Sequence, residues 1–393
     1  MIGAASQNPL WGADWTEVRR LWPLDPTVAH LNHGSFGAVS SPVLAEQDRW
    51  RTLMESNPTG FFWRVLPDAM ETARIAAARF VGADPEGFVF STNATTAINS
   101  VLRSLELSDR DEVLVTDHGY GAIHLAAEMA CRRAGATLVV TPVPLPVEGM
   151  DELVEAVMAG VTDRTKIAIV DHIASPTAVV FPVAALVAEL RAHDVLSLVD
   201  GAHAPGMVDL DLSTLDPDFW TGNFHKWCCS PRGSAGLYVR PEHRERIAPL
   251  VSSWYVKEGF VESFGWLGTT DYTPYLSVPP AIGFMEELGW ERLRRHNRRL
   301  AAYGAEVVRE ALGTASLTTA EVYEAMSLVA LPDGTAATVE ETKALSRRVA
   351  ETLGAELAVL PWRDRAYLRL SAQAYNAPVE YEELAVGLRK LLD

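Results

Sequence analysis

From about residue 86 onward, short apolar runs rich in Val, Ile and Phe alternate with amphipathic stretches. A run that is apolar at every position is typical of a strand buried on both faces of a parallel sheet. The stretches 122–133 and 183–192 repeat apolar residues at intervals of three and four, as crossover helices do. The predicted strands are Phe88–Ser91, Glu112–Thr116, Thr137–Thr141, Lys166–Asp171, Val195–Asp200, Asp218–Thr221 and Ala235–Val239. This alternation predicts an α/β doubly wound domain with a parallel or mixed sheet.

The pattern changes after the proline-rich segment TPYLSVPPAIGF. One helix is predicted over residues 281–308, followed by fewer continuous apolar runs and a last helix over 379–392, which together indicate a smaller α+β domain. We therefore expect an N-terminal arm over 1–30, a large domain over 31–275 and a small domain over 276–393. The arm carries Trp11, Trp15 and Trp22 without a clear period, as a segment does that packs on another surface, such as that of a second subunit.

Composition and charge exclude several classes of protein. The 393 residues are 48% hydrophobic, and 34 Lys and Arg against 51 Asp and Glu give a formal charge of -17. Such a surface repels nucleic acid and anionic membranes. The N-terminus lacks the pattern of a secretory signal and no run is long enough to span a bilayer, so we expect a cytoplasmic protein. Cys131, Cys228 and Cys229 form no disulfide framework and no metal-binding spacing, which predicts free thiols and no metal.

Polar residues that directly follow the predicted strands are the first candidates for chemistry, because ligands of open α/β sheets bind outside the carboxyl ends of strands. Residues 92–96, TNATT, follow one strand and open a helix, where free N–H groups, hydroxyls and the helix dipole suit a phosphate. Simple capping of that helix is the alternative. At the next strand end, His118 and Tyr120 offer flat rings that could stack on a flat cofactor. A histidine in this position is more often at the surface or hydrogen bonded.

Three further strand ends complete the set. Asp171 and His172 could hydrogen-bond a substrate or a cofactor. Asp200 ends a very apolar strand, where a carboxylate is costly to bury unless a cation, such as a protonated pyridine nitrogen, pairs with it; capping of the next turn is the alternative. Lys226 lies between aromatic residues, which lower its pKa and favour Schiff-base chemistry, although most lysines are merely solvated. A phosphate turn, a ring, an acid and a lysine at strand ends of one sheet could surround a single cofactor.

The motifs themselves carry a resemblance. VDGAHAPG at 199–206, with NFHKW at 223–227, resembles the class V group of fold-type I pyridoxal-phosphate enzymes, and most closely its isopenicillin N epimerase-like branch. LNHGSFG at 31–37 is similar to the start of that branch's folded domain, and Arg369-Leu370-Ser371 with Tyr375-Asn376 matches its C-terminal signature. The resemblance covers about residues 31–392. It implies an aspartate aminotransferase-like fold, with a mixed, mostly parallel sheet in the large domain, and pyridoxal 5'-phosphate as cofactor.

The resemblance also implies roles for individual residues. Lys226 would carry the cofactor as a Schiff base, Asp200 would pair with the pyridine nitrogen, and His203 would approach the phenolic oxygen. Thr95, Thr96 and His225 would hold the phosphate, and His118 or Tyr120 would stack on the ring. Thr269 in the loop 268–270 would reach the phosphate across a homodimer interface. Arg369, with Asn32 and Ser35 beside it, would bind the substrate carboxylate. A bidentate guanidinium suits that last task.

The reaction is less determined than the cofactor, because the protein selects among several outcomes by orienting bonds and placing acids and bases. No cysteine lies between Thr270 and Arg369, where desulfurases of this class carry their nucleophile. The run KWCCSPRG at 226–233 resembles lyase-like members, some of which act in secondary metabolism. A carbon–sulfur β-lyase acting on an S-substituted cysteine is therefore the first hypothesis. One alternative is an epimerase, which needs a second base such as His118, Tyr120 or His172. Decarboxylation, deamination and transamination are further alternative reactions. The last alternative is a catalytically silent homologue.

Overall fold

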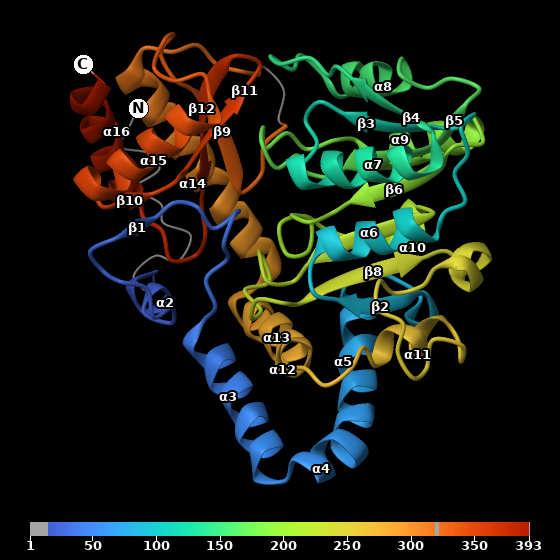
Figure 1. Ribbon diagram of the computed structural model, residues 1–393. Coiled ribbons are helices and arrows are strands. Elements are labelled where there is room, and N and C mark those ends of the chain that lie inside the picture. Colours follow the sequence, from blue (N-terminus) through green and yellow to red (C-terminus); the bar gives the residue numbers. More distant parts are fainter. Residues whose placement is uncertain (1–14, 319–321, 393) are drawn as a thin grey trace.

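A seven-stranded sheet forms the centre of the larger half of the computed structural model, which describes residues 15–318 and 322–392 (Figure 1). Its strands are β2 Phe88–Ser91, β3 Glu112–Thr116, β4 Thr137–Thr141, β5 Thr165–Asp171, β6 Leu196–Asp200, β7 Phe219–Asn223 and β8 Ala235–Val239. The spatial order is β2-β8-β7-β6-β5-β3-β4. Strand β8 runs antiparallel to β2 and β7 on its two sides, and the other neighbouring pairs of this sheet are parallel. The predicted mixed, mostly parallel α/β sheet is confirmed.

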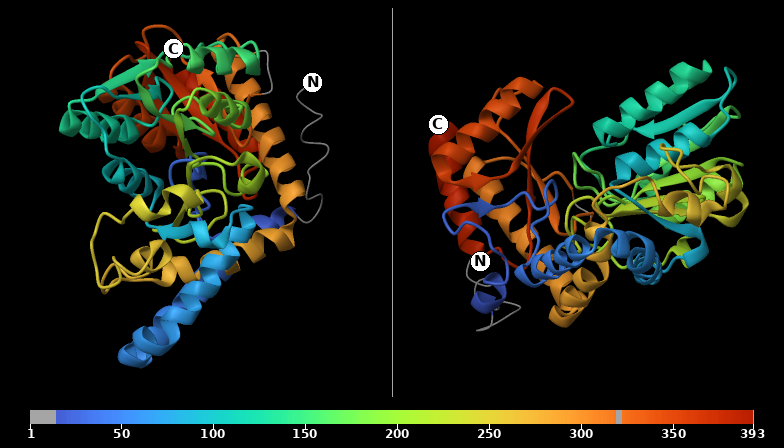
Figure 2. Two further views of the ribbon diagram at one scale, coloured as in Figure 1. Left: turned by 90° about the vertical axis from the view of Figure 1, so that its right-hand side faces the viewer. Right: turned by 60° about the horizontal axis from the view of Figure 1, so that its bottom comes forward.

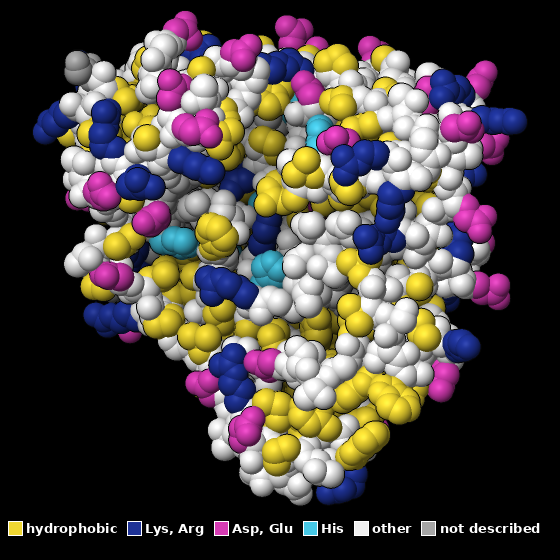
Figure 3. Space-filling model, viewed as in Figure 1, with side chains coloured by type: hydrophobic (Ala, Val, Ile, Leu, Met, Phe, Trp, Pro, Cys, Tyr) yellow, Lys and Arg dark blue, Asp and Glu magenta, His cyan; other side chains and the backbone are white. Residues whose placement is uncertain are grey.

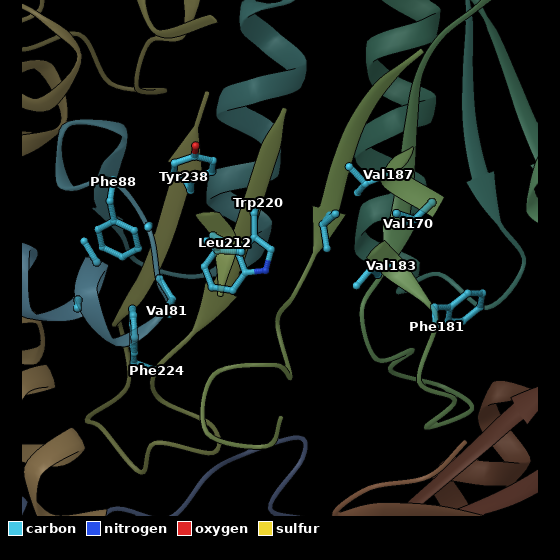
Figure 4. Packing of buried hydrophobic residues seen from close by; sticks show 14 of the residues in the cluster. Val81, Phe88, Val170, Phe181, Val183, Val187, Leu212, Trp220, Phe224 and Tyr238 are labelled. Atoms are coloured by element: carbon cyan, nitrogen blue, oxygen red, sulfur yellow. The ribbon is translucent and has the colours of Figure 1, made fainter. Parts of the chain in front are cut away.

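Helices cover both faces of this sheet, so its strands are buried on two sides (Figure 1). The covering helices include α5 Leu66–Phe80, α6 Ala94–Ser104, α7 Gly121–Ala134, α8 Met150–Met158 and α9 Val183–Ala192. Neighbouring residues along a strand belong to different cores: Phe88 and Trp220 pack on one side, while Val89 and Phe219 pack on the other. Figure 4 shows the first of these cores, between the strands and the segment around Val81. This alternation explains why apolar residues occupy consecutive positions within the strands.

The C-terminal part forms a three-stranded antiparallel sheet packed on long helices. Its strands β9 Met326–Ala330, β11 Ala358–Trp362 and β12 Arg365–Ser371 have the order β11-β12-β9, and its helices are α14 Trp290–Leu312, α15 Val339–Leu353 and α16 Pro378–Leu392. The prediction of a single helix over residues 281–308 is wrong. This segment forms two helices, α13 Val278–Leu288 and α14, because Gly289 between them has a φ of 87°, which no helix accommodates.

The described part of the predicted N-terminal arm packs on its own chain. Helix α2 Trp15–Arg19 precedes Trp22, whose ring lies 5.5 Å from that of Phe284 and 5.6 Å from that of Tyr375. Strand β1 Ala29–His30 then pairs in parallel with β10 Ala355–Glu356. Trp11 lies outside the described residues. The domain limits at residues 30 and 275 stay predictions.

The remaining elements are short or lie at the periphery. Helix α3 Ser41–Ser56 projects at the bottom of Figure 1 and returns through the following turn into α5. The others are α4 Pro58–Gly60, the π-helix η2 Phe61–Val65, the 3-10 helices η3 Pro85–Gly87 and η4 Pro241–Arg246, and α10 Leu212–Leu215, α11 Phe260–Gly265 and α12 Thr273–Leu276. Within the described ranges, no helix combines the length and the apolar character that a bilayer crossing requires.

Candidate active site

Lys226 and Asp200 lie at the carboxyl ends of neighbouring parallel strands. Asp200 is the last residue of β6, and Lys226 follows the end of β7 by three residues. Asp171 ends β5 and is the register partner of Asp200. These ends meet where the large sheet faces the small domain. Figure 2 shows the arrangement of the two halves, and Figure 3 shows a hollow between them with basic and histidine side chains.

The Lys226 amine is held by a histidine whose tautomer is set by its neighbours. Trp227 Nε1–H donates to His203 Nδ1 at 3.3 Å, so the proton of the neutral imidazole is on Nε2. That Nε2 lies 3.0 Å from Lys226 Nζ. Burial keeps the pKa of His203 well below its usual value, and burial together with the Arg369 charge lowers the pKa of Lys226 to about 7. The lysine is therefore available as a neutral amine near neutral pH.

Asp200 is a buried carboxyl group with 4% exposure, and burial raises its pKa. Its Oδ1 accepts a hydrogen bond of 3.0 Å from the backbone N–H of Ala202. The pKa of Asp171 is raised well above its usual value by burial and then by the charge of Asp200. Among the described residues, no arginine or lysine forms a salt bridge with Asp200. A carboxylate in this state is complementary to a cationic ring nitrogen.

The turn between β2 and α6 is both a cap and an anchor. Asn93 is the N-cap residue of α6, and its Oδ1 accepts from Thr96 N at 2.8 Å, so helix capping is confirmed here. The N–H of Ala94 donates to Asn223 Oδ1 on β7 at 2.9 Å, which ties the turn to the strand that precedes Lys226. Thr95 is partly buried beside it. The turn is thus tied to the end of β7, three residues before Lys226.

His225 has one nitrogen occupied and one available. Its Nδ1 lies 2.8 Å from the carbonyl oxygen of Ser234, and since a carbonyl can only accept, Nδ1 carries the proton. Burial lowers the pKa of His225 to about 4. Nε2 of the neutral ring then has only a lone pair, so a phosphate dianion near it would favour uptake of a proton.

Arg369 is enclosed by three side chains from other elements and is 2% exposed. Its Nη2 donates to Ser35 Oγ at 2.6 Å and to Asn32 Oδ1 at 3.4 Å, and its Nη1 donates to Ser175 Oγ at 3.1 Å and to the Ser175 carbonyl. The Nε has no partner among the described residues. The predicted trio of Arg369, Asn32 and Ser35 is brought together. A buried cation held by neutral groups can exchange them for a carboxylate.

The two candidate rings occupy different environments. His118 is fully buried, with Nδ1 2.8 Å from Thr177 Oγ1 and Nε2 3.2 Å from the Val143 carbonyl. The charges that act on His118 are those of Asp117 and Arg363, and burial lowers its pKa to about 4. Tyr120 is 48% exposed and is near enough to Arg369 to act on the pKa of that guanidinium. The structure therefore leaves Tyr120 half-exposed and holds His118 in the core.

The N-terminal motif holds the lysine turn from the opposite side. His33 Nε2 donates to the Lys226 carbonyl at 2.9 Å, so its Nδ1 accepts from the Tyr375 hydroxyl at 2.8 Å. Burial lowers the pKa of His33 to about 3, which keeps the ring neutral. A side chain on Gly37 would place its Cβ 2.5 Å from the His225 carbonyl oxygen, so only glycine fits this approach. Three distant sequence motifs thus meet at one peptide.

The sequence matches the family model "Aminotransferase class-V" over residues 61–378, more than half of the chain. The chain belongs to this family. The class-V chain is 35% identical to isopenicillin N epimerase of Amycolatopsis lactamdurans, over 96% of this chain and 98% of that protein. It is 28% identical to hercynylcysteine sulfoxide lyase of Schizosaccharomyces pombe, over 79% and 81% of the two chains. A solved structure of C-DES, a variant with glycine covalently linked to its PLP cofactor, superimposes with a TM-score of 0.79 at 21% identity, over 94% and 98%.

Family membership confirms the predicted fold type and makes pyridoxal phosphate the cofactor of this class-V enzyme. The residues fit it. The pKa of Lys226 is lowered to about 7, Asp200 is a buried acid without a salt bridge to a lysine or arginine in the described chain, and the His203 Nε2–H points at the amine. When bound, the cofactor supplies an electron sink for negative charge at the substrate's Cα. Asp200 would hold a proton at the ring nitrogen, and Lys226 would take or return a proton at Cα.

Sequence reasoning missed several groups of this class-V site. Ser175 binds Arg369 with both its hydroxyl and its carbonyl, but no pattern in the segment 172–178 indicates this. The sequence presents Asn223 and Trp227 only as neighbours of Lys226, although one anchors the turn between β2 and α6 and the other fixes the His203 tautomer. A polar residue at the end of a buried strand is the signal that could have found Asn223. Thr269 is exposed on its own chain.

Proposed function

We propose that this class-V enzyme is a carbon–sulfur β-lyase that acts on an S-substituted cysteine. The observation that carries the proposal is the 3.0 Å contact between Lys226 Nζ and Nε2 of neutral His203, which supports Lys226 as the base that removes the Cα proton. Elimination needs a single base and a leaving group, and no second base on the opposite face. His118, one of the histidines considered for that second base, has both ring nitrogens engaged in the core. The lyase named among the relatives supports the same reading.

The chain's own residues account for the steps of an elimination. Arg369 binds the α-carboxylate and so fixes the orientation of the Cα–H bond toward Lys226. The Lys226 amine removes the Cα proton, and the electron pair of the Cα–H bond forms a double bond between Cα and Cβ. The Cβ–S bond breaks, and its bonding pair leaves with the sulfur as a thiolate. Lys226, now protonated, can return its proton to the leaving thiolate. The released enamine hydrolyses to pyruvate and ammonia, so each turnover yields pyruvate, ammonia and one sulfur product.

Amino-acid epimerisation is the second candidate, and one observation favours it. Tyr120 lies half-exposed near Arg369, where a hydroxyl could return a proton to the other face of Cα. The 35% identical relative is named as an epimerase. We propose Tyr120, rather than His118, as the ring that faces the cofactor under either reading. Lyase and epimerase then differ in whether the sulfur group leaves before a proton returns.

A panel of cysteine conjugates and simple amino acids in deuterated water separates these reactions. The lyase should release pyruvate, ammonia and a thiol or sulfenic product in equal amounts. An epimerase returns intact substrate labelled at Cα, decarboxylation releases carbon dioxide, and transamination yields a keto acid without loss of sulfur. If no conjugate gives pyruvate while an amino acid without a leaving group is racemised, the lyase proposal is wrong.

The Tyr120→Phe variant is the matched control for the second candidate. It keeps the ring for stacking and removes the acid. A lyase should retain most of its turnover in this variant, and racemisation should be lost while labelling of Cα by solvent continues through Lys226. Lys226→Ala should lose all of these reactions, which separates enzyme turnover from spontaneous loss of thiol.

We further propose that the enzyme works as a homodimer with shared sites. Trp63 and Trp254 are 70% and 86% exposed beside an apolar hollow of about 540 Å³, and large exposed apolar surfaces of this kind are typical of interfaces. Thr269 is exposed on its own chain, as a residue that serves the partner's phosphate site would be. Mixing inactive Lys226→Ala chains with inactive Thr269→Asp chains should restore activity in the mixed dimer. Restored activity would be absent if each chain completed its own site.

A further inference from the structure

The hairpin that carries Arg369 also makes contact with the loop that carries Tyr120. Strands β11 and β12 pair antiparallel, with Trp362 opposite Arg365, and are joined by the two-residue turn Arg363-Asp364. From this turn, Arg363 reaches the large domain and donates to Asp117 Oδ2, with Nε at 2.9 Å, and to the Val143 carbonyl at 2.7 Å. Asp117 directly follows β3, three residues before Tyr120.

Trp362 adds to this contact on the same loop. Its Nε1–H donates to the Asp117 carbonyl at 3.1 Å, and its ring meets that of His118 edge to face at 4.9 Å. The Arg363 guanidinium lies 4.1 Å from the centroid of the Trp362 ring. Asp117 Oδ1 in turn accepts from Val143 N at 2.9 Å. A partly exposed ion pair alone contributes little to stability, but here it is one part of a cluster that also contains hydrogen bonds and ring contacts.

The turn itself adopts a conformation that its residues disfavour. Arg363 has a φ of 46° and Asp364 a φ of 60°, both in the left-handed region, where two-residue hairpins prefer Asn-Gly. A non-glycine pair in this conformation persists where surrounding contacts hold it. Arg363, which adopts one of these disfavoured conformations, is also the residue that contacts the large domain. The conformation of the Arg363-Asp364 turn therefore points to a function of this contact.

We propose that Trp362 and Arg363 form an interdomain latch that positions the site. The latch holds the loop 117–120, and with it Tyr120, at a fixed place relative to Arg369, which lies further along β12. It explains why His118 is buried with both nitrogens engaged: the ring supports Trp362 and does not face the cofactor. Arg363 acts through Asp117 and Tyr120 and is a positioning residue. The link to catalysis rests on the proposed role of Arg369, whereas the link between the two domains does not.

Breaking the latch should lower the fraction of protein in which Arg369 and Tyr120 are correctly placed. Because the apparent affinity falls in proportion to that fraction, a competent fraction of about one in ten raises the substrate KM by about tenfold. Saturating substrate selects the competent form, so kcat should change much less. If Arg363 had a merely structural role, its substitution would lower the melting temperature and leave the ratio of KM to kcat unchanged.

The test compares Arg363→Ala with Arg365→Ala, a matched control on the same hairpin. The two arginine side chains are 41% and 38% exposed, and Arg365 binds Asp333 and the Leu331 carbonyl within the small domain. Amide hydrogen exchange of residues 117–123 is measured in the apoprotein, without cofactor or substrate. We expect faster exchange in this loop for Arg363→Ala only, with a partial effect for Arg363→Lys, which also serves if the alanine variant fails to fold.

The outcomes separate the latch from the proposed function. Equal exchange of residues 117–123 in the Arg363 and Arg365 variants would overturn the latch, whatever the activity. Faster exchange with an unchanged KM for a turned-over substrate would overturn its positioning role. Faster exchange in a protein that turns over no cysteine conjugate would support the interdomain contact and count against the lyase proposal. Faster exchange with a raised KM and a retained kcat supports the latch in full.

Discussion

Replacing Arg369 by lysine keeps the buried positive charge and removes the planar fork. The guanidinium uses both of its terminal nitrogens on Ser35, Asn32 and Ser175, which marks two directions in which a carboxylate can be bound. An ammonium can replace one of the two contacts. The loss is therefore about one hydrogen bond to a charged group, roughly 1.5–3 kcal/mol, or about 10- to 150-fold in affinity.

The assay needs no knowledge of the natural substrate. Glycine and glycinamide differ in the carboxylate, and their binding can be followed through the absorbance of the bound cofactor. The wild-type enzyme should prefer glycine strongly, and Arg369→Lys should lose about 10- to 150-fold of that preference while its cofactor spectrum without ligand stays unchanged. Ser175→Ala is a control that removes a hydroxyl partner and keeps the guanidinium. A variant that still discriminates glycine from glycinamide as the wild type does would refute the role of Arg369.

Three further predictions concern the lysine and the acid. Lys226→Ala should fold and bind cofactor without a borohydride-reducible link, and a reducible adduct in this variant would mean that another amine carries the cofactor. Asp200→Asn should retain cofactor but slow Cα–H exchange by at least about 100-fold, a barrier increase of about 2.7 kcal/mol, because an amide cannot hold the ring nitrogen protonated; exchange at the wild-type rate would contradict this. Since the pKa of Lys226 is lowered to about 7, capture of cofactor by the apoprotein should accelerate as pH rises through 7 and then level off. Acceleration that continues to about pH 10 would indicate an ordinary lysine.

The sheet was predictable because its strands contain short runs of consecutive apolar residues, a pattern that is typical of strands buried on both faces. Differences are confined to the ends. Val195 was assigned to a strand, but its N–H bonds back to the Leu190 carbonyl at the end of α9, so β6 begins at Leu196. Strand β7 extends to Asn223 because β8 pairs with it as far as Ala235. Gly289 interrupts an otherwise continuous helical pattern, and only its positive φ reveals the break.

The positions of Lys226 and Asp200 at the ends of neighbouring strands were predictable because their motifs follow apolar runs, and their roles stay predictions. The choice between His118 and Tyr120 could not be made, because it depends on how the loop after β3 turns and on which side Trp362 packs. Ser175 and Arg363 were missed for the same reason: their partners are 194 and 246 residues away in the chain. Local periodicity carries no information about contacts of that range.

The burial of all three cysteines has a practical consequence for labelling the protein. Cys131, Cys228 and Cys229 are free thiols in the core, and burial raises the pKa of each, to about 12 for Cys229. Because the thiolate is the reactive form, maleimides and disulfide reagents should modify the folded native chain slowly. A single cysteine introduced on the surface would therefore carry a fluorophore or spin label almost alone, without prior removal of native cysteines.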